Sequence, residues 1–303
     1  MKNSKIGGIP YGFLAICLGP TLLLTIVFLI WPTLNALFMS FTNITSMGAS
    51  SKAKFVFLDN YIYMFTRDKN FFQAMTNTLK LLAVVPVVTV FIALIFAFLL
   101  TQTKIAERGF YRVLFFLPSV VSMAVVGIVW ATLFDPRSTG PINKIISLFG
   151  AKSVTWLGDE RYALWCIALV LIWQAIGYYM VMHVAAIDSI SHDIYEAADI
   201  DGANQARKFF NITIPLLKDS IGITYVLSLS GTIALSYTLS SIMTNGGPGG
   251  ASLVLLQHMY NTAFGASSNF GYAMTITVFS LILAFVLSIL SRKVSYHNEN
   301  TQG

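Results

Sequence analysis

The sequence has few charged residues and almost no cysteine. Asp, Glu, Lys and Arg make up only 11% of its 303 residues, whereas hydrophobic residues make up 56%. An average soluble domain has roughly 25% charged residues. Both cysteines, Cys17 and Cys166, lie in apolar runs, where a buried thiol behaves as a small hydrophobic side chain. This composition indicates a membrane protein and gives no sign of a disulfide framework.

Motifs for energy conversion and covalent chemistry are also missing. No G-x-x-x-x-G-K-[ST] phosphate loop is present, so we predict that this chain does not hydrolyse ATP. The acidic residues fall in loops or at the ends of apolar runs, which argues against a proton relay, because relays place carboxylates inside membrane spans. The histidines lack metal-ligand spacing, and no Ser/His/Asp set converges within a span. We therefore expect no enzyme activity, no metal and no cofactor in this chain.

The net charge of +6 comes from basic residues scattered over short loops. Without a clustered patch, lipid headgroups are a better partner for them than nucleic acid. Lys80 is the basic residue that lies well inside an apolar run, and it could either extend to the membrane interface or contact a solute. A path with so few cations suits a neutral solute better than a phosphate or a carboxylate.

Six apolar runs are long enough to cross a hydrocarbon core of ~30 Å, which takes about 20 helical residues. They cover residues 12–40, 78–101, 112–134, 162–187, 219–244 and 270–291. Because a membrane leaves few alternatives to the helix, we predict an all-α membrane protein with six transmembrane helices in a single domain, 1–303. The first run is too long for a signal peptide and is predicted to be retained. The distribution of Lys and Arg favours a cytoplasmic N-terminus only slightly, so orientation stays open.

A polar segment, residues 188–217, separates the fourth and fifth runs and contains YEAADIDGANQARKFFNITIPLL. Asp193 and Glu196 have the spacing of a capping box, which predicts a short helix capped by Asp193. Gly202 has no side chain and would let another surface approach closely, and Pro215 suits the first turn of the next helix. The pattern predicts a helix, a close-contact glycine and a bend that project from the membrane. An ordinary solvated loop is the alternative.

Candidate solute contacts lie on the fourth and fifth runs. Ser228, Thr232 and Ser236, followed by Ser240, recur every four residues and form a slowly turning polar stripe beside Tyr237. Such a stripe could line a path or could join membrane helices, since small hydroxyl residues do both. Gln174, one helical turn before Tyr178, is a stronger candidate, because its amide can both donate to and accept from solute hydroxyls.

The residues of segment 188–217 resemble the EAA loop of ABC importer permeases, whose pattern is EAA-x3-G-x9-I-x-L-P. Glu196, Ala197 and Ala198 are followed by Gly202 and, after nine intervening residues, by "ITIP" with Ile214 in place of Leu. Ser191 stands where sugar permeases often have Pro. Other stretches along nearly the whole chain are similar to carbohydrate permeases of the maltose and glycerol-phosphate type. They include LDNY (58–61), RGFYRVLFFLP (108–118), GPIN (140–143) and TNGGPG (244–249).

The resemblance implies a type I ABC importer permease fold and a carbohydrate import function in a bacterial or archaeal plasma membrane, with both termini cytoplasmic. It also implies a second homologous permease, ATPase subunits that bind ATP and Mg, and an extracytoplasmic solute-binding protein. The residues that it places at the ATPase contact are Glu196, Ala197, Ala198, Asp199, Gly202 and Ala203. Glycerol phosphate or another polyol is an alternative solute, and an ATP-independent secondary carrier is the alternative mechanism.

Overall fold

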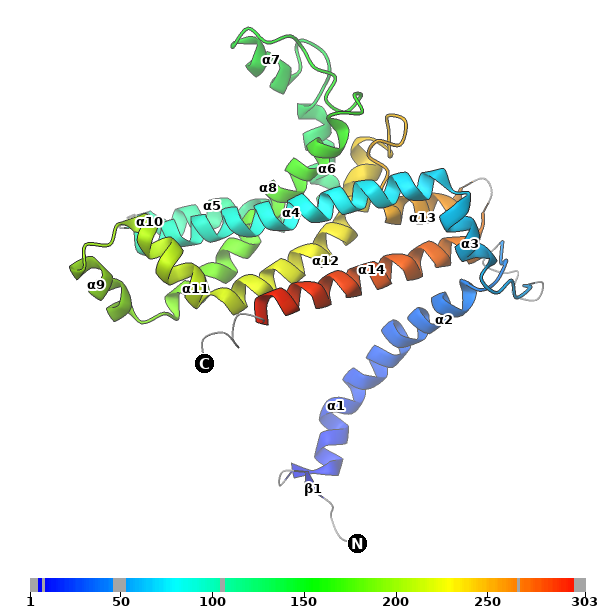
Figure 1. Cartoon of the computed structure of the whole chain (residues 1–303), viewed down its shortest axis with the longest axis horizontal. Coiled ribbons are helices and arrows are strands. Elements are labelled where there is room, and N and C mark those ends of the chain that lie inside the picture. The colour runs from blue at the N-terminus through cyan, green and yellow to red at the C-terminus, as the bar shows by residue number, and fades with distance from the viewer. Residues whose placement is uncertain (1–4, 7–8, 46–52, 104–106, 266–267, 297–303) are drawn as a thin grey trace. The chain divides into compact units, whose positions relative to one another are not determined.

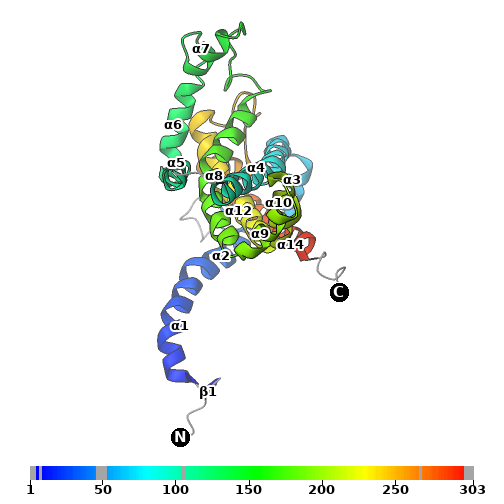
Figure 2. The same ribbon diagram turned by 90° about the vertical axis from the view of Figure 1, so that its left-hand side faces the viewer.

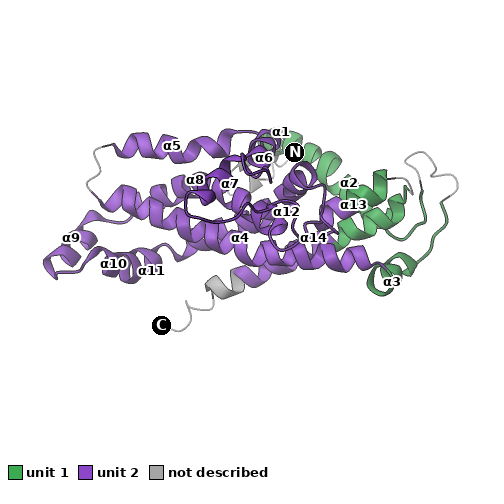
Figure 3. Cartoon of the chain, turned by 90° about the horizontal axis from the view of Figure 1, so that it is seen from above, with its two compact units in different colours: residues 1–67, 259–279 green, residues 68–258, 280–303 purple. Residues whose placement is uncertain are grey.

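The computed structural model describes residues 5–6, 9–45, 53–103, 107–265 and 268–296. The chain divides into two compact units (Figure 3). Unit 1 comprises residues 1–67 and 259–279, and unit 2 comprises residues 68–258 and 280–303. The division falls within two helices, α13 (Leu255–Phe264) and α14 (Phe270–Tyr296).

Unit 1 is dominated by one long apolar helix near the N-terminus, which follows a pair of two-residue strands (Figure 1). Its parts are β1 (Lys5–Ile6), β2 (Ile9–Pro10), α1 (Tyr11–Thr25), the π turn η1 (Ile26–Ile30), α2 (Trp31–Met39) and α3 (Asp59–Thr66). The π turn directly precedes Pro32, where the missing N–H and the ring disturb regular helical bonding. No residue of the most apolar stretch of Gly12–Met39 is buried inside the chain.

Unit 2 is built on three long helices, α4 (Lys69–Gln102), α8 (Ala163–Asp188) and α12 (Lys218–Met243). The helix α4 packs along α8, and α12 packs against both. Asp68 caps the start of α4 by accepting a hydrogen bond from the Phe71 N–H at 3.0 Å. The core contains interdigitated aliphatic side chains from all three helices, including Leu81, Val85, Ile167, Leu171 and Leu239. The apolar faces that hydropathy detects are thus partly buried against one another.

The third apolar run, 112–134, forms two helices instead of one. They are α5 (Arg108–Val120) and α6 (Met123–Leu133), and their axes differ by 96°. Pro118 lies in the last turn of α5 and cannot donate a backbone hydrogen bond, and the two residues that follow Val120 are extended. Figure 2 shows α5 end-on, with α6 rising from it. Among the described residues, five helices are long and apolar enough to cross a membrane, or six if this bent pair counts as one span.

The helices α8 and α12 of unit 2 match the predicted apolar runs closely. The sequence predicts helices over 162–187 and 219–244, and α8 and α12 cover 163–188 and 218–243. The helix α4 begins earlier than the run at 78, because its first turns are polar and still helical. Shorter elements connect these helices, namely α7 (Pro141–Ser147), α9 (His192–Ile200), α10 (Gln205–Lys208), the π turn η3 (Phe209–Thr213) and α11 (Ile214–Leu216).

Candidate functional site

The segment between α8 and α12, residues 189–217, is called the arm. Its first helix, α9, begins at His192 with Ser191 in the extended N-cap position. The predicted capping box headed by Asp193 is therefore wrong. Asp193 lies in the first turn, where its carboxylate favours the positive end of the helix dipole, and the Glu196 carboxylate lies 3.1 Å from Nδ1 of His192.

The helix α9 has an inner and an outer face. Tyr195 and Ala198 are buried on the inner face, and Tyr195 joins the apolar cluster between α4, α8 and the start of α12. Glu196 and Ala197 are exposed on the outer face, as is Ile200 with 87% of its surface. The residues predicted to dock an ATPase are thus divided, because Ala198 faces the chain itself and Ala203 is half-buried.

Gly202 ends α9 in a left-handed conformation with φ of +73°. Its N–H donates to the Asp199 carbonyl at 3.1 Å, and the Ala203 N–H donates to the Ala198 carbonyl at 2.8 Å. These two bonds form a Schellman motif, in which glycine is the residue of least strain. No atom outside the immediate backbone lies within 4 Å of the position that a Cβ would take. The close approach predicted at this glycine therefore has no partner within the described chain, and this surface is open.

The second half of the arm returns to the membrane helices. Asn204 caps α10 by accepting from the Arg207 N–H at 2.9 Å. The Phe209 ring packs edge-on against Phe98 of α4, with centroids 5.1 Å apart. Pro215 lies in the first turn of α11, as its missing N–H predicts, and the π turn η3 directly precedes it.

Gln174 lies on α8 beside the break between α5 and α6. Its Nε2 is 3.5 Å from the carbonyl oxygen of Ser119, in the last turn of α5. The two helices meet closely here because Gly177 has no side chain: a Cβ on it would lie 1.8 Å from the carbonyl oxygen of Phe115. Tyr178 follows on the same helix with 48% of its surface exposed. The predicted pair Gln174 and Tyr178 is therefore accessible next to an irregular backbone segment.

The polar stripe on α12 lies inside unit 2. Ser228, Thr232 and Ser236 are all buried. Ser228 shares a side-chain hydrogen bond with Tyr179 of α8, whereas the other two hydroxyls bond to the backbone of α12. The Thr232 hydroxyl donates to the Ser228 carbonyl at 2.8 Å, and the Ser236 hydroxyl donates to the Ile233 carbonyl at 3.0 Å. Tyr237 is half-buried. The structure therefore separates this stripe from the more accessible Gln174 and Tyr178.

The glycine-rich segment after α12, residues 244–254, is called the turn. It is held by buried polar groups, and the sequence pattern predicted this role for none of them. Asn77 of α4 donates to the carbonyls of Gly250 and Leu253 at 3.0 and 2.9 Å. The Ser240 hydroxyl contacts Gln257 Oε1 at 2.5 Å and the Ser252 carbonyl at 2.6 Å. The only sequence signal for this arrangement is the excess of Ser, Thr, Asn and Gln at the ends of two apolar runs.

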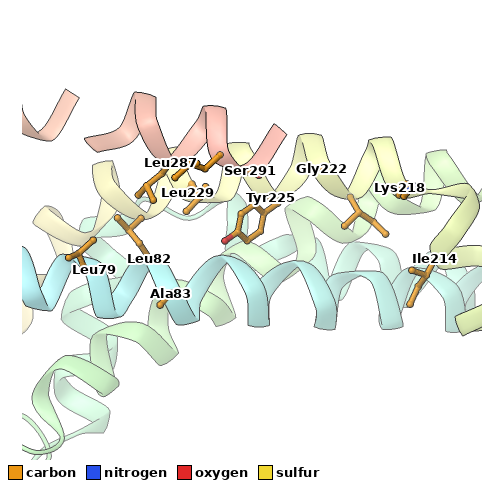
Figure 4. A pocket seen from close by; sticks show the side chains of 12 residues that line it. Leu79, Leu82, Ala83, Ile214, Lys218, Gly222, Tyr225, Leu229, Leu287 and Ser291 are labelled. Carbon is orange, nitrogen blue, oxygen red and sulfur yellow. The ribbon is translucent and has the colours of Figure 1, made fainter. Parts of the chain in front are cut away.

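A cavity of about 800 Å³ opens between α4, α12 and α14 (Figure 4). Its wall is mainly aliphatic, with the Tyr225 side chain pointing into it and Lys218 at one end. The lining residues are Leu79, Leu82, Ala83, Ile214, Lys218, Ile221, Gly222, Tyr225, Leu229, Leu287, Leu290 and Ser291. None of the predicted path residues is among them. Within the described part of the chain, no three His, Cys, Asp or Glu side chains come together as a metal site.

The sequence matches the family model of the binding-protein-dependent transport system inner membrane component over residues 81–296. The chain belongs to this family. It is 34% identical to the diacetylchitobiose uptake system permease NgcF of Streptomyces coelicolor, over 94% of this chain and 82% of NgcF. It is 31% identical to the lactose transport system permease LacF of Rhizobium radiobacter, over 89% of this chain and 90% of LacF.

The permease also has the fold of a solved structure, a bacterial ABC transporter involved in the import of alginate. The TM-score is 0.80 over 94% of this chain and 95% of that one, at 21% sequence identity. These matches confirm the predicted fold class and the predicted identity as a permease of the carbohydrate ABC importer type. The multi-pass membrane location is confirmed with it.

Proposed function

We propose that this permease imports a neutral mono- or oligosaccharide, which a binding protein delivers from outside and which separate ATPase subunits drive inward. The observation that carries this proposal is the outer face of the arm. It exposes Glu196 and Ala197 next to the open surface at Gly202, on a segment that is itself well ordered by hydrogen bonds. The helix α9 ends in a Schellman motif, and Ile200 beside the open surface is 87% exposed, which suits a surface that a partner covers.

In this proposal the outer face of α9 contacts an ATPase subunit, which holds ATP and Mg. The contact residues are Glu196, Ala197, Asp199 and Gly202, supported from within by Ala198 and Ala203. Because the ATPase is cytoplasmic, the arm faces the cytoplasm. With the bent pair α5 and α6 counted as one span, the number of spans is even, which places both termini on that side. A second homologous permease completes the membrane part of the importer.

The sugar specificity is supported by two observations. The relatives NgcF and LacF are named as permeases for diacetylchitobiose and lactose. In addition, the break between α5 and α6 leaves irregular backbone in an apolar segment, which membrane proteins tolerate where it lines a cavity. The carbonyl of Ser119 and the amide of Gln174 offer uncharged hydrogen-bond groups there, and Tyr178 offers an accessible ring. This chemistry suits sugar hydroxyls better than a phosphate.

The burial of Ser228, Thr232 and Ser236 supports helix packing as the role of the stripe. Tyr237 lies beside it. We assign the solute contact on this chain to Gln174 and Tyr178 instead.

The proposal is tested by ATP-dependent sugar uptake into proteoliposomes that contain the complete importer. Glu196→Lys reverses the charge at the centre of the outer face, and Gly202→Asp places a charged side chain on its open surface. Both variants should lose uptake and ATPase co-purification. Glu107→Lys is the matched control, since Glu107 is equally exposed but precedes α5. Uptake that persists without any ATPase would instead establish a secondary carrier.

The solute contact is tested separately with Gln174→Ala. We expect slower uptake, with the assembled complex and its ATPase content unchanged. The measurement is the initial uptake rate as a function of sugar concentration. An unchanged rate would remove Gln174 from the solute path and leave the ATPase contact untouched.

A further inference from the structure

Two hydrogen bonds in series connect α9 to the returning limb of the arm. The hydroxyls of Tyr195 and Thr213 are 2.9 Å apart, and Thr213 Oγ1 is 3.2 Å from the carbonyl of Lys208. A carbonyl only accepts, so the single hydroxyl proton of Thr213 is used there and Tyr195 must be the donor to Thr213. Burial raises the pKa of Tyr195 above its ordinary value, although its bond to Thr213 lowers it in part, which keeps the phenol protonated.

An ion pair crosses the same gap at a second point. Nζ of Lys208 lies 2.5 Å from the Asp199 carboxylate. The Lys208 side chain is only 5% exposed, whereas that of Asp199 is 64% exposed. Lys208 therefore takes part in both contacts. Its carbonyl accepts from the Thr213 hydroxyl, which in turn bonds to Tyr195, and its ammonium pairs with Asp199. Asp199, one of the predicted docking residues of α9, is therefore already paired with a lysine of the same chain.

These contacts continue into α12 through the backbone. The Leu217 N–H donates to the Thr213 carbonyl at 3.0 Å, and the Ile221 N–H donates to the Leu217 carbonyl at 2.8 Å. Thr213 thus contacts α9 with its side chain and the start of α12 with its carbonyl. Pro215 has no donor, but the bond from the Leu217 N–H to the Thr213 carbonyl spans it, and the Ile214 N–H directly before it donates to the Phe209 carbonyl in the π turn η3.

The four side chains that join the two limbs are called the latch: Tyr195, Asp199, Lys208 and Thr213. We infer that the latch makes the arm and the start of α12 move as one body, so that a displacement of α9 reaches the membrane helix instead of being absorbed by bending of the arm. This inference rests on the proposed contact between α9 and an ATPase. It assigns positioning roles to these four residues. Tyr195, Lys208 and Thr213 do not need to touch the ATPase for this role.

The test measures sugar molecules imported per ATP hydrolysed by the complete importer in proteoliposomes. Tyr195→Phe removes one hydroxyl and keeps the buried ring, and Thr213→Val removes the other hydroxyl at nearly constant volume. Each should lower the ratio about fivefold, the factor that the loss of one hydrogen bond commonly makes in an equilibrium. Because the two hydroxyls share a bond, the double variant should lose less than the product of the two single losses.

Lys208→Met tests the ion pair while keeping an unbranched apolar stem. The matched control is Arg207→Met, since Arg207 is the adjacent basic residue and is exposed. Tyr111→Phe on α5 is the control for the loss of a tyrosine hydroxyl. The controls should keep the wild-type ratio, whereas Lys208→Met should lower it as the hydroxyl variants do.

ATPase co-purification separates this inference from the function on which it rests. Latch variants should retain the ATPase and continue to hydrolyse ATP while importing less sugar. A wild-type ratio in the latch variants would overturn the inference and leave the docking role of α9 intact. Loss of the ATPase from these variants would also overturn it, since the four residues would then shape the docking surface. If Glu196→Lys kept both the ATPase and uptake, the proposed docking function would fail and this inference would fall with it.

Discussion

The arm and the turn are both polar connections at the ends of α12, but they use their polar residues in opposite ways. In the arm, charged and apolar side chains such as Glu196 and Ile200 point outward, whereas Tyr195 and Phe209 are buried against the membrane helices. The turn is held by Asn77 of α4, Ser240 of α12 and its own Ser252, whose polar groups are buried and bond to the backbone. The charged arm therefore presents a surface, whereas the uncharged, glycine-rich turn forms an anchor.

This difference predicts two separable classes of variant. A change at the turn should reduce stability, because buried carbonyls lose their donors. A change on the outer face of the arm should alter partner binding with little effect on stability, because surface substitutions usually stay within about 0.5 kcal/mol. A change in the latch or in the cap of α9 lies between the two classes.

The largest effect is expected from Asn77→Leu. The substitution leaves the carbonyls of Gly250 and Leu253 without their side-chain donor, at a cost of roughly 2–4 kcal/mol in the free energy of unfolding. The measurement is the thermal unfolding temperature of the purified importer. ATPase co-purification at low temperature should not change. Gln73→Leu is the matched control, because the hydrogen bond from Gln73 to the Gly249 carbonyl is exposed, whereas Asn77 is buried. Equal unfolding temperatures for the two variants would contradict the anchoring role of Asn77.

An intermediate effect is expected from Gly202→Ala. A left-handed backbone costs a residue with a Cβ about 1–2 kcal/mol, so the cap of α9 should loosen. Gly150→Ala is a close control, since Gly150 has φ of +76° and the same open space around its Cβ position. Both variants should lose similar thermal stability, but only Gly202→Ala should lower the sugar imported per ATP. A loss of import in both would show that general destabilisation, and not the shape of the arm, controls coupling.

The smallest effect is expected from Ile200→Ser. Removal of an apolar side chain that the ATPase would cover should weaken ATPase binding by about 1 kcal/mol, or roughly fivefold, while the unfolding temperature stays unchanged. The control is Leu148→Ser next to α7, where Leu148 is 80% exposed. The affinity can be measured by titrating purified ATPase against the permease complex in nanodiscs. Equal affinities for wild type and Ile200→Ser would remove Ile200 from the docking surface.

The broken third span shows where prediction from the sequence stops. Hydropathy identifies residues 112–134 as one apolar run because both α5 and α6 are apolar, and it contains no information on their direction. The bend depends on Pro118 and on the close approach of Phe115 to Gly177, which lies on another helix. Contacts between residues distant in the sequence cannot be detected from the periodicity of a single segment.

The arm shows the same limit on a smaller scale. Its helix and its helix-opening proline were predicted from local chemistry, whereas Gly202 was predicted as a close-contact position and the structure shows a left-handed helix end there. The N-cap position of Ser191 was not predicted, because several polar residues in succession can each cap a helix. The inward direction of Ala198 and the pairing of Lys208 with Asp199 depend on how the returning limb packs.

The sequence by itself determined that this protein is a helical membrane permease and where most spans begin and end, and it predicted that the arm contacts a partner. It could do so because transfer of apolar groups out of water and the bonding needs of the backbone act along the chain, residue by residue. Only the tertiary structure decided that α5 and α6 diverge, that the stripe of α12 is buried, and that four side chains join the two limbs of the arm. Those features arise where separate helices meet, and the free energy of a contact depends on both partners.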